Sequence, residues 1–297
     1  PLKNVARLAE KEWGEANIGK LTDLGAKNSY KKGGHLREYY VSKMHFISDA
    51  TPYNEIYVAS SDAQRTIETA KHTLNGMFAD RAKNIELNVI PSDQPLLRPT
   101  RAQKANLKKF DDHFKTELNA LKDAFEKKTN IKLDNINDII SIGGILDVNR
   151  IHNKPYPENI IGKEISERII QVWKDRYIAR MSSHRHSCTR GKNILVHIDH
   201  RFTQKVADKH PQKLILFFAH DGTLSSVLNL LDKMPNFIPP YNADLRFELY
   251  KEDTTGKHFV RTSLDDALIK VCGSEYCEYK DFHAKVEKNL MHKCNGY

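Results

Sequence analysis

The 297-residue sequence has no apolar run that approaches the roughly 20 residues needed to cross a bilayer. It has no Asn-x-Ser/Thr sequon, so N-glycosylation is not expected. No G-x-G-x-x-G follows any predicted strand, and the glycine pair in "SIGGIL" (141–146) lacks that pattern, which argues against a nucleotide-binding dehydrogenase. Basic segments interleaved with aromatics are also missing. We therefore expect a globular protein without stable membrane insertion and without nucleic acid as a partner.

Cysteine is scarce but even in number. The chain has four cysteines, Cys188, Cys272, Cys277 and Cys294. Two disulfides would use all of them, with three pairings open, and "CGSEYC" would close a small loop between Cys272 and Cys277. Zinc is the alternative, since His283 and His292 are nearby, but the loop lacks the usual two-residue spacing. Disulfides are favoured over a metal, which predicts a secreted, periplasmic or lysosomal, lumenal location.

The formal charge is +9. A basic balance favours acidic partners such as phosphorylated small molecules. The lysines, however, are spread along helical stretches such as "KKFDDHFKTELNALKDAFEKK", where they alternate with acids, which is typical of a solvated helix face. The charge therefore agrees with an anionic substrate but does not select one.

Strand and helix patterns alternate at both ends of the chain. Strands are expected at 55–61, 84–90, 213–219, 245–250 and 258–263. Helices are expected over 21–44, 62–78, 193–209 and 222–231. Between them, 101–186 is helical, with breaks near Asn130 and in "NKPYPEN" (153–159). This order predicts an α/β core of residues 1–98 plus 188–297 with an inserted helical cap domain, 99–187.

Two of these strands end in charged turns that lead into helices, "VASSDAQR" and "FFAHDGT". Ligands of α/β sheets bind beyond the carboxyl ends of the strands, and helix N-termini there favour anions. Taken singly, Arg65 fits a solvated helix residue, His220 a structural histidine and Asp221 a helix N-cap. Taken together, they would supply an oxyanion clamp and a proton donor, which phosphomonoester hydrolysis requires.

Four blocks in this order resemble the histidine acid phosphatase family, in its prostatic, lysosomal and lysophosphatidate phosphatase branch. They are "LTDLGAKNSYKKGGHLREYY", "VASSDAQRTIETAKHTLNGMF", "FFAHDGTLSSVLNLL" and "FELY…FVR". The resemblance implies the phosphoglycerate-mutase-like fold, with a central mixed, mostly parallel sheet. It also implies an acid phosphatase that works through a phosphohistidine without a cofactor or metal. Arg65 and His220 would bind phosphate, and Asp221 would be the general acid.

The family's Arg-His-Gly-x-Arg-x-Pro signature, which carries the nucleophilic histidine, is not in this sequence. Pro1 is similar to its last residue, so we expect the nucleophile and the central strand that bears it to precede Pro1. A catalytically inactive, phosphate-binding relative is the alternative that the missing signature supports. A phosphoglycerate-mutase-like phosphotransferase is a further alternative, but it usually has Glu where this chain has the His220–Asp221 pair.

Other conspicuous residues have structural interpretations. Trp13 and the tyrosines of 30–40 are read as core or cap-interface aromatics, and the His-rich "SSHRHSC" (182–188) as an exposed loop. His197 and His200 are three residues apart on a predicted helix, where a metal bridge is the less favoured alternative. The substrate would be selected by the helical cap. The resemblance also leaves a homodimer open.

Overall fold

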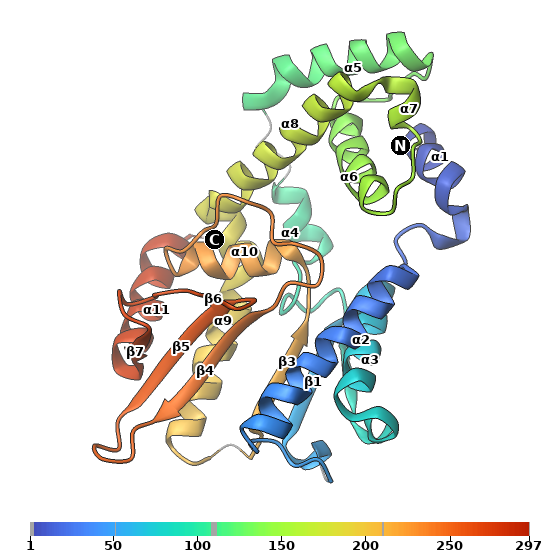
Figure 1. The fold of residues 1–297 in the computed structure, drawn as a ribbon. Helices are drawn as coiled ribbons and strands as arrows, with labels where there is room; N and C mark the ends of the chain where they lie inside the picture. Colours follow the sequence, from blue (N-terminus) through green and yellow to red (C-terminus); the bar gives the residue numbers. More distant parts are fainter. Residues whose placement is uncertain (1–2, 51, 108–111, 210, 297) are drawn as a thin grey trace. The chain divides into compact units, whose positions relative to one another are not determined.

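The computed structural model describes residues 3–50, 52–107, 112–209 and 211–296. The chain divides into an α/β unit, Leu21–Ala105 with Met181–Tyr297, and a helical unit, Pro1–Lys20 with Asn106–Arg180 (Figure 1). The sequence had placed the first twenty residues with the α/β core. They belong to the helical unit because α1 (Lys3–Trp13) buries Val5 and Leu8 in that unit's apolar cluster.

The strands of the α/β unit form two sheets rather than one. The first is parallel, in the order β2-β1-β3, and the second is antiparallel, in the order β4-β5-β6 with β7 also paired to β5. The strand bounds are β1 (Ile56–Ser61), β2 (Leu87–Ile90), β3 (Leu214–Phe218), β4 (Leu245–Lys251), β5 (His258–Leu264), β6 (Ala267–Leu268) and β7 (Tyr276–Glu278). The α/β class is thus as predicted, and each expected strand is present.

The two sheets lie in the same layer of the unit, although no ladder joins β3 to β4 among the described residues. Phe217 of β3 and Phe247 of β4 pack on the same apolar cluster, to which α9, α10 and α11 contribute. The neighbouring β3 side chains, Leu216 and Phe218, pack on the opposite cluster, formed with α2 and α3. A single mixed, mostly parallel sheet was expected, and the interruption between β3 and β4 is the difference.

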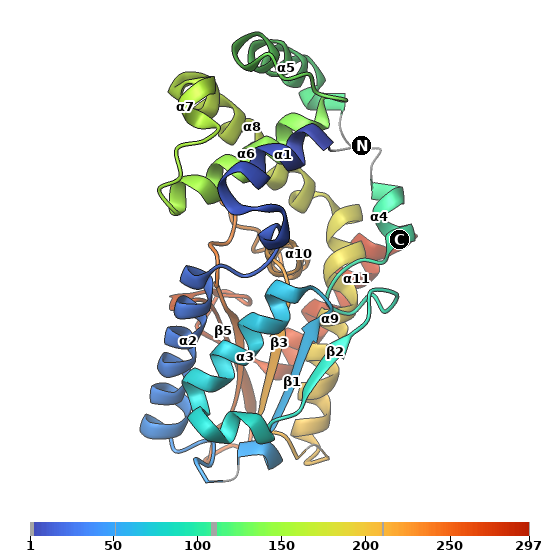
Figure 2. The same cartoon turned by 90° about the vertical axis from the view of Figure 1, so that its right-hand side faces the viewer.

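Helices cover both faces of this layer, with α2 and α3 on one side and α9 and α11 on the other (Figure 2). Thr22 caps α2 by accepting a hydrogen bond from the Gly25 N–H at 3.1 Å. The helices of the unit are α2 (Asp23–Arg37), followed by a π-helical turn (Glu38–Lys43), α3 (Gln64–Phe78), α4 (Arg101–Asn106), α9 (His184–Val206), α10 (Asp221–Leu230) and α11 (Tyr279–Cys294). Among the described residues, no helix combines the length and the apolar character needed to cross a membrane.

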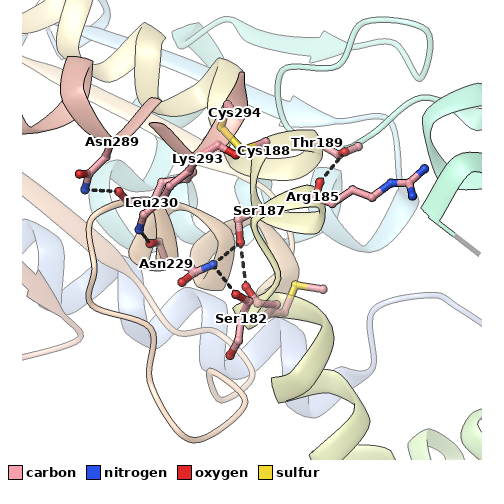
Figure 3. The surroundings of a disulfide bond; sticks show 11 residues. Ser182, Arg185, Ser187, Cys188, Thr189, Asn229, Leu230, Asn289, Lys293 and Cys294 are labelled. Atoms are coloured by element: carbon pink, nitrogen blue, oxygen red, sulfur yellow. Dashed lines mark hydrogen bonds between the residues drawn. A yellow bond between two sulfur atoms is a disulfide. The ribbon is translucent and has the colours of Figure 1, made fainter. Parts of the chain in front are cut away.

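Helix α9 begins nine residues earlier than predicted, so "SSHRHSC" is not an exposed loop. Its last five residues lie within α9, and both His186 and Cys188 are buried. A disulfide helps to hold this segment in the interior, because Cys188 is bonded to Cys294 at the end of α11 (Figure 3). Around this disulfide, Asn229 of α10 donates to Ser187, and Lys293 donates to the Asn229 carbonyl. The second disulfide joins Cys272 to Cys277, as the sequence suggested.

The helical unit has its own apolar core. Asn130, in the left-handed conformation, ends α5 where the sequence predicted a break. Trp13 donates its indole N–H to Asn149 of α6 at 2.7 Å, which makes it a structural residue of this unit. The helices are α1, α5 (Lys115–Thr129), α6 (Asn137–Ile151), α7 (Glu158–Ile161) and α8 (Lys163–Ser182).

Candidate functional site

Pairing of β1 with β3 brings the two predicted turns together. The strands are parallel and Ser60 lies opposite Phe218, so the residues that follow them emerge at one edge of the sheet. Arg65, in the first turn of α3, places its Nη2 atom 3.5 Å from Nδ1 of His220. The convergence of these two predicted residues is therefore present in the fold.

Two buried hydroxyl groups lie on the interior side of His220, and one of them contacts its ring. Its Nε2 atom lies 3.1 Å from Oγ of Ser61, the last residue of β1. Ser61 Oγ is 2.8 Å from Oγ1 of Thr66 on α3. Ser61 and Thr66 are both buried. One ring nitrogen of His220 thus faces the protein interior, while the other faces Arg65.

Three further cations surround this edge: Arg98 from the turn after β2, Lys104 of α4 and Arg190 of α9. Burial, together with the positive charges of these groups and of Arg65, lowers the pKa of His220 to about 4. The pKa of Lys104 is lowered by burial and by the same arginines. So much positive charge in one place favours a ligand with more than one negative charge.

Specific packing holds these cations in position. The turn that carries Arg98 is tied down by Thr223, whose hydroxyl donates to the Leu97 carbonyl at 2.8 Å. Arg98 also forms an ion pair with Asp62. Arg190 is next to α10 because Gly191 lets the two helices touch: a Cβ at Gly191 would lie 2.9 Å from the backbone of Ser226. A glycine at this crossing is what brings the guanidinium to the site.

Asp221 is the first residue of α10 and is exposed. The helix N-cap is His220, not Asp221, and its side chain makes no capping bond. The ordinary N-cap interpretation of Asp221 is therefore wrong. Its carboxylate has no hydrogen bond or ion pair to the residues that the structure describes, so it is free to meet a ligand beside His220.

The other candidate ligands have different partners. His197 accepts a hydrogen bond from Arg201 Nε at 3.1 Å and packs its ring edge-on against Phe217. The four cysteines are all in disulfides, so no thiolate is left for zinc. Within the described ranges no group of three His, Cys, Asp or Glu residues is arranged to hold a metal ion.

Sequence reasoning missed three of the four cations at the site. Arg98 could have been found, because it follows a predicted strand in the same way as Arg65 and His220 do. Lys104 and Arg190 gave no such signal. Arg190 lies just after a stretch that was read as a loop, and its approach depends on the long-range contact between α9 and α10.

This fold and its cationic edge define an α/β protein with a candidate anion site. The chain matches the Histidine phosphatase superfamily (branch 2) over residues 2–139 and 146–265, and it belongs to that family. The "Putative acid phosphatase 5" of Caenorhabditis elegans is 24% identical over an alignment of 261 residues that covers 81% of this chain and 60% of that protein. The prostatic acid phosphatase of Homo sapiens is 26% identical, over 85% of this chain and 70% of the relative.

Solved structures share the fold at lower identity. The phytase of Citrobacter braakii superposes with a TM-score of 0.66 over 93% of this chain and 90% of that one, at 14% identity. This identity supports the fold alone. The chain spans 60% and 70% of the lengths of the two curated relatives named above.

Proposed function

We propose that this protein is an acid phosphatase that hydrolyses phosphomonoesters through a phosphohistidine intermediate. In this proposal Arg65 and His220 bind the phosphoryl group, and Asp221 is the general acid. The observation that carries it is the approach of Arg65 to His220, 3.5 Å between Nη2 and Nδ1, at the sheet edge where α10 begins. Family membership and the names of the relatives support the same reaction class.

The site suits phosphoryl transfer electrostatically. A guanidinium offers two parallel N–H donors to phosphate oxygens, and such charge-assisted bonds are roughly twice as strong as neutral ones. Positive groups fixed around the phosphoryl oxygens also stabilise the transition state, because they need no reorganisation as the reaction proceeds. Arg98, Lys104 and Arg190 would add to this field, and the field suits a phosphate dianion better than a neutral ester.

The reaction would proceed in two balanced steps. A histidine nitrogen attacks phosphorus, the bond from phosphorus to the ester oxygen breaks, and Asp221 gives its proton to the departing alcohol. Water then attacks the phosphohistidine and returns a proton to the Asp221 carboxylate. Inorganic phosphate leaves, and the free histidine is restored.

The nucleophilic histidine remains outside the residues assigned to this site. We propose that it is carried by a strand that lies between β3 and β4, parallel to β3. Both strands pair on one side only among the described residues, and both face the same apolar cluster. The carboxyl end of such a strand would emerge beside His220, where a nucleophile is needed.

The two disulfides support an oxidising compartment, since such bonds form and persist there. We therefore propose that the enzyme is secreted, periplasmic or lysosomal. An inactive phosphate-binding relative would have the same site, so only turnover separates the two functions.

The test compares two leaving groups in the natural protein and in Asp221→Asn. p-Nitrophenolate leaves with little need of a proton, whereas an alkoxide needs one. For an alkyl phosphate, kcat is expected to fall by on the order of 10²–10⁴ in the variant, because general acid catalysis is lost. For p-nitrophenyl phosphate the fall is expected to be much smaller.

Asp253→Asn is the matched control, because Asp253 is an exposed aspartate in the turn between β4 and β5. It should leave kcat for both substrates unchanged. An equal loss for both substrates in Asp221→Asn would remove Asp221 from the acid role. Binding of inorganic phosphate with no hydrolysis of either substrate would overturn the enzyme assignment in favour of the inactive relative.

A further inference from the structure

The hydroxyl groups below His220 form a directed chain of hydrogen bonds. Thr66 Oγ1 lies 2.8 Å from the Ala63 carbonyl and 3.0 Å from the Ser61 carbonyl, and both of these groups can only accept. Its single proton is therefore directed to one of these carbonyls. Ser61 Oγ, 2.8 Å away, then donates its own proton to Thr66. The Ser61 oxygen is left as an acceptor.

This direction determines the protonation of the His220 ring. Nε2 lies 3.1 Å from the accepting oxygen of Ser61, so Nε2 carries a hydrogen. The other nitrogen, Nδ1, faces Nη2 of Arg65, which can only donate. Nδ1 must therefore present its lone pair. Both neighbours select the same tautomer of a neutral ring.

We infer that Ser61 and Thr66 are positioning residues that hold His220 with Nε2–H toward the interior, so that the proton gained on anion binding goes to Nδ1 at the site. This inference rests on the proposed function only in assuming that an anion binds beside Arg65. Neutral Nδ1 repels a phosphate oxygen, because both are acceptors. Protonated Nδ1 donates to that oxygen instead.

The charges around His220 couple the two events. Arg65 of α3, Arg98 after β2, Lys104 of α4 and Arg190 of α9 all disfavour imidazolium in the empty site. The negative groups at this edge are Asp62, which is paired with Arg98, and Asp221, which follows His220 as the first residue of α10. A bound dianion offsets the cations and favours the protonated ring, so binding takes up a proton.

The tautomer is tested by ¹⁵N NMR of the histidine ring nitrogens in the anion-free protein at pH 7, with His220→Asn used to assign the signals. We expect His220 in the wild type to show the Nε2–H pattern alone. In Ser61→Ala only Arg65 still selects this tautomer, so a fraction of the Nδ1–H form should appear beside it, and Ser61→Thr should restore the single form. Ser60→Ala is the matched control, because Ser60 is equally buried in β1 but donates to the Ser61 carbonyl rather than approaching His220.

Proton uptake is tested by calorimetry with sulfate, a dianion that exchanges no proton in this range. At pH 5.5, titrations in two buffers of different ionisation enthalpy should give an uptake approaching one proton per sulfate bound. Sulfate affinity in Ser61→Ala should be about 3- to 10-fold lower, because one hydrogen bond to the ring is lost. Ser60→Ala should bind sulfate as the wild type does.

The outcomes separate this inference from the proposed function. An Nδ1–H pattern in the wild type, or sulfate binding without proton uptake, would overturn the inference even if the enzyme hydrolyses phosphomonoesters. The expected tautomer and uptake would support it even in a protein that hydrolyses nothing, since neither measurement depends on turnover.

Discussion

At the scale of single residues, the environment of His220 makes protonation of its ring unfavourable in the folded protein. Burial and four nearby cations lower its pKa to about 4, below the ordinary value for histidine. The folded protein therefore resists protonation of a ring that the unfolded chain protonates readily. A bound anion would relieve this cost.

The sign of the resulting pH dependence follows from linkage. Above pH 6.5 the ring is neutral in both states and contributes nothing. As the pH falls from 6.5 toward 4, the unfolded state binds the proton first, so stability decreases. The free energy of unfolding of the wild type, measured in urea without added anions, should fall between pH 7 and pH 4.5 by about 2 kcal/mol more than that of His220→Asn.

His292→Asn is the control for this comparison, because His292 is an exposed residue of α11. It should show the same pH dependence as the wild type. Equal slopes for the wild type and His220→Asn would mean that the pKa of His220 is not depressed in the folded protein.

Residue chemistry predicted part of the site from the sequence. Arg65 and His220 were found because each follows a recognisable strand, and parallel strands present their carboxyl ends together. The Ser61–Thr66 pair was within the quoted "SSDAQRT" but gave no signal, since hydroxyl residues near a helix start are common caps. Arg190 depends on a helix crossing that no local pattern reveals.

At the scale of elements, the crossing of α2 and α3 depends on two glycines. A Cβ at Gly33 would lie 2.0 Å from the Thr73 carbonyl oxygen, and one at Gly76 would lie 2.0 Å from that of Tyr30. The helices can approach this closely only because both positions lack a side chain. This contact supports α3, which carries Arg65.

Gly33→Ala should therefore lower the free energy of unfolding by at least about 2 kcal/mol, since the two backbones must separate. Gly34→Ala is a matched control one residue along, where an added Cβ meets nothing within 4 Å. That variant should be neutral or more stable by up to about 1 kcal/mol, because alanine favours a helix. Chemical denaturation measures both, and similar values for the two would contradict the close crossing.

Elements with strong local patterns were predicted well and the others were not. Strand β1 and helix α10 begin and end within one residue of their predicted bounds, because a β-branched run or an amphipathic period defines each. The start of α9 was missed since its first turns, "HRHSC", are polar and are buried by contacts distant in sequence. Helix α11 was missed for a similar reason: its buried face, with Phe282 and Val286, is narrow between charged residues.

At the scale of the whole molecule, the sequence predicted the α/β class and a helical cap but not their boundaries. Residues 1–20 join the helical unit through apolar contacts made more than 100 positions away. The interruption between β3 and β4 could not be predicted from the local sequence either. Each strand has an ordinary strand pattern, and that pattern does not show whether the two strands pair. Which strands pair over long distances in the sequence depends on the other strands present in the fold. The β-propensity of a single strand does not indicate its partner.

The central claim is that one anion binds between Arg65 and His220 at the start of α10. A crystal structure of the protein with tungstate, a heavy phosphate mimic, tests it most directly. We predict a single strongly bound ion that accepts hydrogen bonds from the Arg65 guanidinium and from Nδ1 of His220, with the Asp221 carboxyl facing it. Tungstate bound elsewhere, with Arg65 and His220 turned apart, would contradict the account.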